Sequence, residues 1–244
     1  MNLLVDIGNT RIKWAIRQGT HTLHTAACLH TELAMLPAQI APWPISKVVA
    51  CNVAGPELAQ ALAAAVQPLT VQWLIPGRER CGIHNSYTEP ARLGADRWAA
   101  LIGARQQREG DLLVVMAGTA LTVDALTTEG VFLGGTISPG LQLMRKSLAQ
   151  GTAELGLPPG QATEFPCNTG DAIFNGALVA LAGAIEHMAA RLARFRGHEV
   201  SCLISGGDAA VITPWLGIAA SHVCHIDNLV LEGLAVVANE EISL

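Results

Sequence analysis

The sequence has few charges, few aromatic side chains and almost no lysine. Only 14% of its 244 residues are charged and 4% are aromatic, and three lysines accompany twelve arginines. The formal net charge is −5, and no run of basic residues stands out. Because a nucleic-acid groove usually needs a basic stripe, this composition argues against nucleic acid as a partner.

Two familiar nucleotide-binding signatures are also missing. Neither the P-loop pattern GxxxxGK[ST] nor the Rossmann pattern GxGxxG occurs in the chain. Any nucleotide that binds is therefore expected to use another architecture.

Signals for export and for a membrane are weak. The start MNLLVD lacks a cationic stretch and meets Asp6 early, which is unlike a signal peptide. The longest apolar helical stretch, about 177–185, is shorter than the roughly 20 residues that a membrane span requires. Six cysteines without a C-x-x-C pair are typical of free thiols in a reducing compartment. We expect a soluble, cytoplasmic protein with no membrane partner.

The first half of the chain is expected to open with a meander of three strands. Apolar periodicity predicts strands at 2–7, 11–18, 21–27, 46–52 and 70–75, and helices at 30–41 and 56–66. A looser stretch at 76–96 is rich in turn formers. A helix over 95–108 follows, and its apolar face contains Leu93, Trp98, Leu101 and Ile102.

The second half repeats this layout. It is predicted to contain strands at 112–117, 119–126, 131–137, 200–205 and 221–226, and helices at 140–149, 170–196, 208–215 and 228–240. Two halves with the same opening indicate an internal duplication. We therefore expect an α/β protein with two domains, residues 1–110 and 111–244.

The long helix over 170–196 carries an apolar stripe with two possible roles. The stripe either forms a contact between two copies of the chain or packs into the core. Its members are Ile173, Ala177, Leu181, Ile185, Met188 and Leu192.

Two short stretches, residues 5–10 and 115–120, carry the same local pattern. In each, an apolar strand ends in a glycine, a small polar residue follows, and a second strand begins. Glycine lets backbone N–H groups approach an anion closely, and threonine adds a hydroxyl donor. We interpret the pair as two turns that hold the phosphates of one nucleotide. The alternative is two ordinary hairpins with glycine turns.

Three charged residues lie on the strands that flank these turns. Asp6 ends its strand at a phosphate-binding turn, where a carboxylate can hold Mg²⁺, usually through water. Asp124 is a weaker candidate of the same kind, and Lys13 could reach a phosphate. A turn-capping aspartate and a solvated strand lysine remain the alternatives.

Four motifs, in order along the chain, resemble those of a known family. They are DIGNTR (6–11), GADRWAALIGA (94–104), AGTALT (117–122) and GGTISPGL (134–141). Together they resemble the type III pantothenate kinases, a group that includes sequences labelled Bvg accessory factor. That family lies in the acetate and sugar kinase, Hsc70 and actin superfamily.

The resemblance spans nearly the whole chain and implies both a fold and a reaction. The implied fold is a pair of duplicated ribonuclease H-like domains, each a mixed sheet flanked by helices, with a nucleotide cleft between them. The implied assembly is an obligate homodimer. The implied reaction moves the ATP γ-phosphate to the primary hydroxyl of pantothenate, which is the first step of coenzyme A synthesis.

The resemblance also implies roles for particular residues. Asp96 would be the proton acceptor, and Thr169 would reach the substrate pocket from the partner subunit. Residues 205–208 would lie near the adenosine. The pantothenate pocket would be lined by Tyr87, Gly94, Ala95, Asp96 and Arg97. ATP and Mg²⁺ would be held by Asp6, Ile7, Gly8, Asn9, Thr10, Arg11, Ile12, Lys13, Gly118 and Thr119.

The chemistry of the GADR stretch agrees with these roles. Asp96 falls in the first turn of a predicted helix, where the positive end of the helix dipole favours a carboxylate. A carboxylate within hydrogen-bond reach of an alcohol can take its proton during attack on phosphorus. Arg97 can form paired hydrogen bonds with the carboxylate of pantothenate. The alternative is an ordinary helix-capping aspartate beside a surface arginine.

One position departs from the family pattern. Members commonly carry an aspartate two residues before the second-turn glycine, where it helps to bind K⁺ or NH₄⁺. This chain has Met116 there, and a thioether is a poor ligand for a hard cation. We therefore expect the monovalent-cation site to be absent or altered.

Three functions remain open from the sequence. The leading one is a pantothenate kinase. A non-catalytic nucleotide-binding regulator of the same fold is the second, and the accessory-factor label and Met116 favour it. An ATPase, or a kinase for another small alcohol, is the third, because fold alone does not fix function.

Overall fold

The computed structural model describes residues 1–152 and 155–240. The chain divides into two compact units. The first contains residues 1–109 and 129–132 together with the C-terminal segment that begins at Asn228, and the second contains residues 110–128 and 133–227. The C-terminal segment therefore belongs to the first unit, although the sequence placed it in the second domain.

The first unit is built on a five-stranded sheet with the order β3-β2-β1-β4-β5. Strands β1, β2 and β3 pair antiparallel, whereas β4 runs parallel to β1 and β5 runs parallel to β4. The antiparallel pairing of β1, β2 and β3 matches the expected meander. The strands are β1 (Asn2–Ile7), β2 (Ile12–Gln18), β3 (His21–Cys28), β4 (Lys47–Asn52) and β5 (Val71–Trp73).

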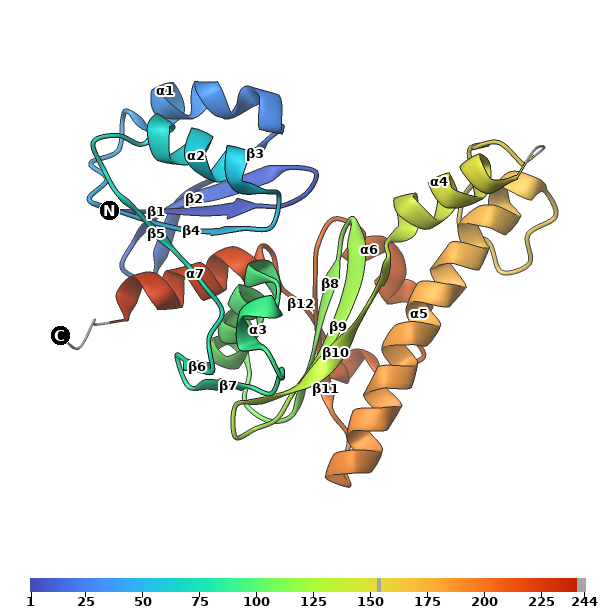
Figure 1. Ribbon diagram of the computed structural model, residues 1–244. Coiled ribbons are helices and arrows are strands. Elements are labelled where there is room, and N and C mark those ends of the chain that lie inside the picture. Colours follow the sequence, from blue (N-terminus) through green and yellow to red (C-terminus); the bar gives the residue numbers. More distant parts are fainter. Residues whose placement is uncertain (153–154, 241–244) are drawn as a thin grey trace. The chain divides into compact units, whose positions relative to one another are not determined.

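Short helices pack on one face of this sheet (Figure 1). They are a 3₁₀ turn (His30–Met35), α1 (Leu36–Ile40) and α2 (Pro56–Ala65). The single helix predicted over 30–41 is thus divided in two, and α1 begins at the residue before Pro37. Proline has no N–H to donate, so it is tolerated in the first turn of a helix but not in the interior.

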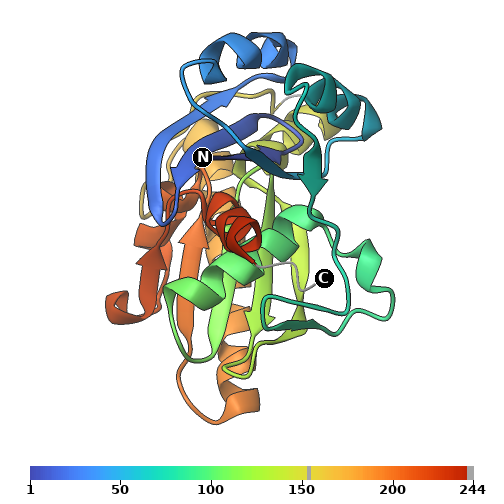
Figure 2. The same ribbon diagram turned by 90° about the vertical axis from the view of Figure 1, so that its left-hand side faces the viewer.

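Helices α3 (Ala95–Gln107) and α7 (Leu229–Asn239) pack against each other in the first unit (Figures 1 and 2). Two glycines allow their backbones to touch. A Cβ on Gly103 would lie 2.6 Å from the carbonyl oxygen of Leu229, and a Cβ on Gly233 would overlap the carbonyl of Ala99. This close approach explains why the C-terminal helix belongs to the first unit.

The stretch 76–96 holds two short strands that the sequence did not predict, β6 (Glu79–Arg80) and β7 (Ile83–Asn85). They pair antiparallel with each other. Strand β7 also pairs in parallel with Val131 and Phe132, the first residues of β10. Strands of two and three residues are too short to show a periodic apolar pattern.

The second unit repeats the strand order of the first. Its strands run β12-β11-β8-β9-β10, with β8 antiparallel to β9 and parallel to β11, which is parallel to β12. The duplication inferred from the two openings is confirmed. The strands are β8 (Leu112–Ala117), β9 (Ala120–Leu126), β10 (Val131–Pro139), β11 (Ser201–Ser205) and β12 (Val223–His225).

The described part of the second unit has three α-helices: α4 (Leu141–Gly151), α5 (Thr169–Arg196) and the single turn α6 (Ala209–Ile212). Two 3₁₀ turns, Thr213–Trp215 and Ala220–His222, follow α6. The apolar stripe of α5 packs against β8 and β9, and Leu181 and Ile185 are fully buried in that core. The stripe therefore forms the core, and the suggestion that it makes a contact between two copies is wrong.

Helix α5 is also the one described helix long and apolar enough to cross a membrane. Its most apolar window of 18 residues has a mean hydropathy of 1.4. The apolar helix is therefore longer than the stretch of about 177–185 that the sequence indicated. Length and composition alone do not distinguish a membrane span from a core helix, and the buried stripe gives this helix a place in the core.

Candidate active site

The first glycine turn joins β1 to β2. The Gly8 N–H donates to the carbonyl of Arg11 at 3.1 Å, and His30 Nε2 donates to the carbonyl of Gly8 at 2.8 Å. Asn9 and Thr10 are exposed. The side chains of Ile7 and Ile12 are fully buried in the core, so these two can face a nucleotide only through their backbone.

The second glycine turn joins β8 to β9 and lies beside two further glycine bends. A Cβ on Gly140 would overlap the Gly118 carbonyl, and a Cβ on Gly206 would overlap the Ala117 carbonyl. Backbone from three connections therefore meets at one end of this sheet.

Gly118 itself is not required by the packing of the chain. It has no positive φ, and the nearest atom to a Cβ there would be the Ala120 carbonyl oxygen at 3.9 Å. Its missing side chain leaves the turn open on the outside. Such a turn suits the close approach of a phosphate to backbone N–H groups.

Asp6 lies in a row of three side chains across the first sheet. It pairs in register with Lys13 on β2 and with Cys51 on β4. The Cys51 thiol donates to Asp6 Oδ1 at 3.4 Å. Burial, and secondly the charge of Asp96, raise the pKa of Asp6 from 3.8 to about 6, although Cys51 and Lys13 oppose the shift.

This shift predicts a pH-dependent stability. Between pH 3.8 and about 6 the folded chain keeps a proton on Asp6 that the unfolded chain has lost. The free energy of unfolding therefore falls as the pH rises through this window. Asp6→Asn should remove the cost of ionising Asp6 in the folded chain. It should raise Tm at pH 7 by about 2–4 °C, which corresponds to roughly 1 kcal/mol in a chain of this size.

Thermal melts of the metal-free chain from pH 3.5 to 8 test this expectation. The difference in Tm between variant and wild type should shrink below pH 6. A constant difference across the range would show that Asp6 titrates normally.

Asp96 lies in the first turn of α3 in the same unit. Its Oδ1 accepts the N–H of Arg97 at 2.8 Å. A Cβ on Gly94 would lie 2.6 Å from that oxygen, so glycine at this position permits the carboxylate to fold back over the start of the helix. The charge of Asp96 raises the pKa of Asp6, so the two carboxylates lie close enough to repel each other.

Arg97 is buried, with 4% of its surface exposed. Its Nη1 donates to the Tyr87 hydroxyl at 2.8 Å. The guanidinium carbon lies 5.7 Å from the centre of the Tyr87 ring and 5.8 Å from that of Phe132. These contacts hold the guanidinium firmly, so the surface arginine considered as an alternative does not apply.

The remaining predicted residues belong to the second unit. Thr169 is exposed at the first position of α5. Gly206 has φ +109° and follows β11, and the N–H of Asp208 donates to the Ala117 carbonyl at 3.0 Å. Residues 205–208 therefore lie against the second glycine turn.

Asp124 does not lie at that turn. It is fully buried inside β9 and packs beneath the backbone of Gly135 on β10. It lies four positions along the strand from Ala120, about 13 Å at the usual rise. This position does not suit a carboxylate that holds a phosphate-bound ion.

No preformed metal cluster exists in residues 1–152 and 155–240, since no three His, Cys, Asp or Glu side chains there converge on one point. Met116 on β8 lies in register between Thr122 on β9 and Ser205 on β11. Its thioether occupies the position where the family pattern has a carboxylate. A thioether is a poor ligand for a hard cation, so Met116 itself does not suit a monovalent cation.

Sequence reasoning missed His30 and Cys51. His30 supports the first turn through Gly8, and Cys51 supports Asp6. Neither residue belongs to a recognisable motif, because each meets the turn only after the strands have paired. The register of β1 with β4 would have identified Cys51.

The two duplicated mixed sheets define the fold class of the protein. The structure is similar to that of an inorganic polyphosphate/ATP-glucomannokinase from Arthrobacter sp. strain KM, with a TM-score of 0.51, 14% identity and coverage of 98% and 100% of the two chains. It is also similar to a Campylobacter jejuni protein described as a Baf family transcriptional activator, with a TM-score of 0.60, 20% identity and 97% coverage of each chain. At these identities the likeness concerns the fold, which is the actin-like fold of ATPases and sugar kinases.

Sequence comparison then identifies the family. The type III pantothenate kinase family model matches residues 2–191. A type III pantothenate kinase of Aromatoleum aromaticum is 48% identical over 244 residues, covering 99% of each chain. One of Chromobacterium violaceum is 47% identical over 240 residues, covering 98% of this chain and 100% of its own. The chain belongs to the type III pantothenate kinase family.

Proposed function

We propose that this protein transfers the γ-phosphoryl group of ATP to the primary hydroxyl of pantothenate, giving ADP and 4′-phosphopantothenate. Family membership over almost the whole chain supports this reaction. The observation that carries the residue assignment is the start of α3. There Gly94 lets Asp96 fold over the helix terminus, beside a buried Arg97 held by Tyr87.

Asp96 is the proposed general base. Its carboxylate accepts the hydroxyl proton of pantothenate as the oxygen forms its bond to the γ-phosphorus and the bond to the ADP oxygen breaks. Arg97 forms paired charge-assisted hydrogen bonds with the pantothenate carboxylate. Tyr87 and Phe132 fix the guanidinium before the substrate arrives, which reduces the entropy lost on binding.

The two glycine turns are the proposed phosphate-binding elements. Residues 6–13 offer backbone N–H groups, the Thr10 hydroxyl and Lys13, and the Gly118–Thr119 turn offers the same kind of donors. Asp6 would hold Mg²⁺, which neutralises phosphate charge when bound. Residues 205–208 would face the adenosine.

We further propose that turnover does not depend on K⁺ or NH₄⁺. The reason is the thioether of Met116 at the position of the family carboxylate. The kinase rate in a Tris background should change by less than about twofold between no added salt and 100 mM KCl, with matched NaCl as the control. A steep increase specific to K⁺ would contradict this proposal.

We propose a homodimer that forms through the exposed side of α5, with each pocket completed by Thr169 of the partner subunit. Val179 is 62% exposed on that side, whereas Leu181 is fully buried. The homodimer itself follows from the family resemblance, and Val179 is an apolar residue of α5 that the core leaves exposed. We also propose a cytoplasmic location, which the free cysteines support. We propose no membrane partner and no nucleic-acid partner, and the acidic net charge argues against nucleic acid.

Light scattering during size exclusion tests this interface. Val179→Asp should give folded monomer, whereas Leu181→Asp should not fold, because it buries an unpaired charge. A Val179→Asp variant that remains dimeric would place the contact elsewhere.

A coupled assay of ADP release, with and without pantothenate, tests the reaction. A kinase gives ADP release that depends on pantothenate. A regulator gives none under either condition, and an ATPase gives the same rate in both.

A further inference from the structure

The connection between α4 and α5 is held in place by buried polar side chains. Its residues 157–167 contain no helix or strand. Asp171 in the first turn of α5 is buried, and its Oδ1 accepts the N–H of Gln161 at 2.9 Å. Its Oδ2 accepts from Asn168 Nδ2 at 2.7 Å, while Asn168 Oδ1 caps the Asp171 N–H at 2.9 Å. One carboxylate thus joins the helix cap to the 157–167 segment.

Asn175, one turn further along α5, makes a second attachment. It is 4% exposed. Its Oδ1 accepts the N–H of Thr163 at 2.9 Å, and its Nδ2 donates to the carbonyls of Gln161 at 2.9 Å and Asp171 at 2.8 Å. The side-chain amide of Asn175 therefore makes hydrogen bonds to the backbone of the segment that another backbone group would make in a helix or sheet. Buried polar groups with all partners present fix one conformation strongly.

Two further contacts reinforce the attachment. Arg145 on α4 lies over the Phe174 ring, 5.3 Å from its centre, and its Nη2 donates to the Pro158 carbonyl at 3.0 Å. A Cβ on Gly160 would overlap the carbonyl of Gly170. At Gly160 the segment is therefore packed directly on the backbone of the first turn of α5.

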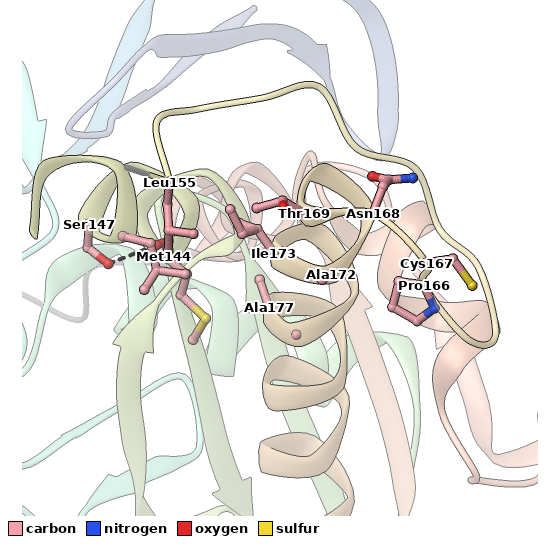
Figure 3. Close-up of a pocket in the computed structure, with 12 residues that line it drawn as sticks. Met144, Ser147, Leu155, Pro166, Cys167, Asn168, Thr169, Ala172, Ile173 and Ala177 are labelled. Carbon is pink, nitrogen blue, oxygen red and sulfur yellow. Dashed lines mark hydrogen bonds between the residues drawn. The ribbon is translucent and has the colours of Figure 1, made fainter. Parts of the chain in front are cut away.

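A pocket of ≈ 880 Å³ lies beside this segment and is lined in part by Thr169 (Figure 3). Met144 and Ser147 line it from α4, and Ile173 and Ala177 line it from α5. Pro166 and Cys167 form its edge on the segment, immediately before Asn168. Asp171 and Asn175 lie outside the pocket lining. Asp171 contacts the lining through the side chain of Asn168, and Asn175 influences it only through the backbone.

We propose that Asp171 and Asn175 are positioning residues for the phosphorylation of pantothenate. They hold the 157–167 segment on α5 and thereby set the position of Thr169 and of the pocket beside it. This inference rests on the proposed function, in which Thr169 takes part in binding the acceptor substrate.

Two variants and a protease test the proposal on the full-length protein. Asn175→Ala removes three hydrogen bonds, and the milder Asp171→Asn keeps one of two accepting oxygens. Glutamyl endopeptidase should cleave after exposed Glu164 about tenfold faster in Asn175→Ala, as expected when the segment loses its attachment. Glu164→Gln is the matched control, because it removes this cleavage site while leaving the attachment intact.

Steady-state kinetics supply the functional half of the test. We expect KM for pantothenate to rise about tenfold in Asn175→Ala and less in Asp171→Asn, with KM for ATP changed by less than about twofold. Glu164→Gln should behave as wild type. A Tm within about 3 °C of wild type would exclude general destabilisation.

Two results would overturn the proposal. One is unchanged cleavage after Glu164 in both variants, and the other is faster cleavage with an unaltered KM for pantothenate. Failure of the proposed function itself is distinguishable, because wild-type protein would then release no pantothenate-dependent ADP, whereas the protease result does not depend on turnover.

Discussion

Asp96→Asn should lower kcat by about 10²–10⁴, which is the range expected for the loss of a general base. The amide keeps the size of the carboxylate and can still accept the N–H of Arg97, which Asp96 Oδ1 accepts at 2.8 Å. It cannot take the hydroxyl proton of the acceptor. KM for ATP and for pantothenate should change much less than kcat, because the loss concerns the transition state.

Steady-state kinetics at saturating MgATP measure this effect, and the Tm of the variant serves as the control for folding. Asp124→Asn offers a comparison of the same chemical change at a buried aspartate that lies away from the turn. A decrease in kcat of less than about threefold in Asp96→Asn would remove Asp96 from the role of base.

Arg97→Gln should raise KM for pantothenate by about 30-fold or more. The loss of one partner of a desolvated, hydrogen-bonded charge pair costs about 2–5 kcal/mol. Tyr87→Phe removes only the 2.8 Å hydrogen bond to the guanidinium, so its KM should rise by less than about tenfold. Neither change should alter KM for ATP by more than about twofold.

D-panthenol, which carries a hydroxymethyl group in place of the carboxylate, makes this test specific. Wild-type protein should prefer pantothenate strongly over panthenol, and Arg97→Gln should lose that preference. A variant that still discriminates between the two compounds would show that another group binds the carboxylate.

Much of the fold could be predicted from local patterns. The strands near 2–7 and 112–117 are mostly apolar runs bounded by turns, and such runs are typical of strands buried on both faces. The helix at 170–196 shows its period over many turns. The repeated glycine turn predicted the duplication, which the matching strand orders confirm.

The rest depends on contacts between residues far apart in the sequence. Gly103 and Gly233 permit α3 and α7 to touch, and nothing local shows that these two glycines meet. The same holds for Cys51 beside Asp6, which requires the register of two parallel strands. The choice between core and dimer for the stripe on α5 required knowing which face packs on the sheet.

Some parts of the candidate site could be predicted from the sequence, and others could not. The GADR stretch predicted an aspartate at the start of a helix, and α3 begins as expected. The burial of Arg97 between Tyr87 and Phe132 was not predictable, since Phe132 reaches the first unit through a separate segment of the chain. That both glycine turns bind the phosphates of one nucleotide stays a prediction.

The most direct test of the central claim is the identity of the product. Phosphorus NMR of the protein with MgATP and equimolar pantothenate should show one new phosphomonoester signal, growing in step with ADP. Appearance of inorganic phosphate alone would indicate an ATPase, and an unchanged ATP spectrum would indicate a regulator. Either of these results would contradict the assignment of the chain as a pantothenate kinase.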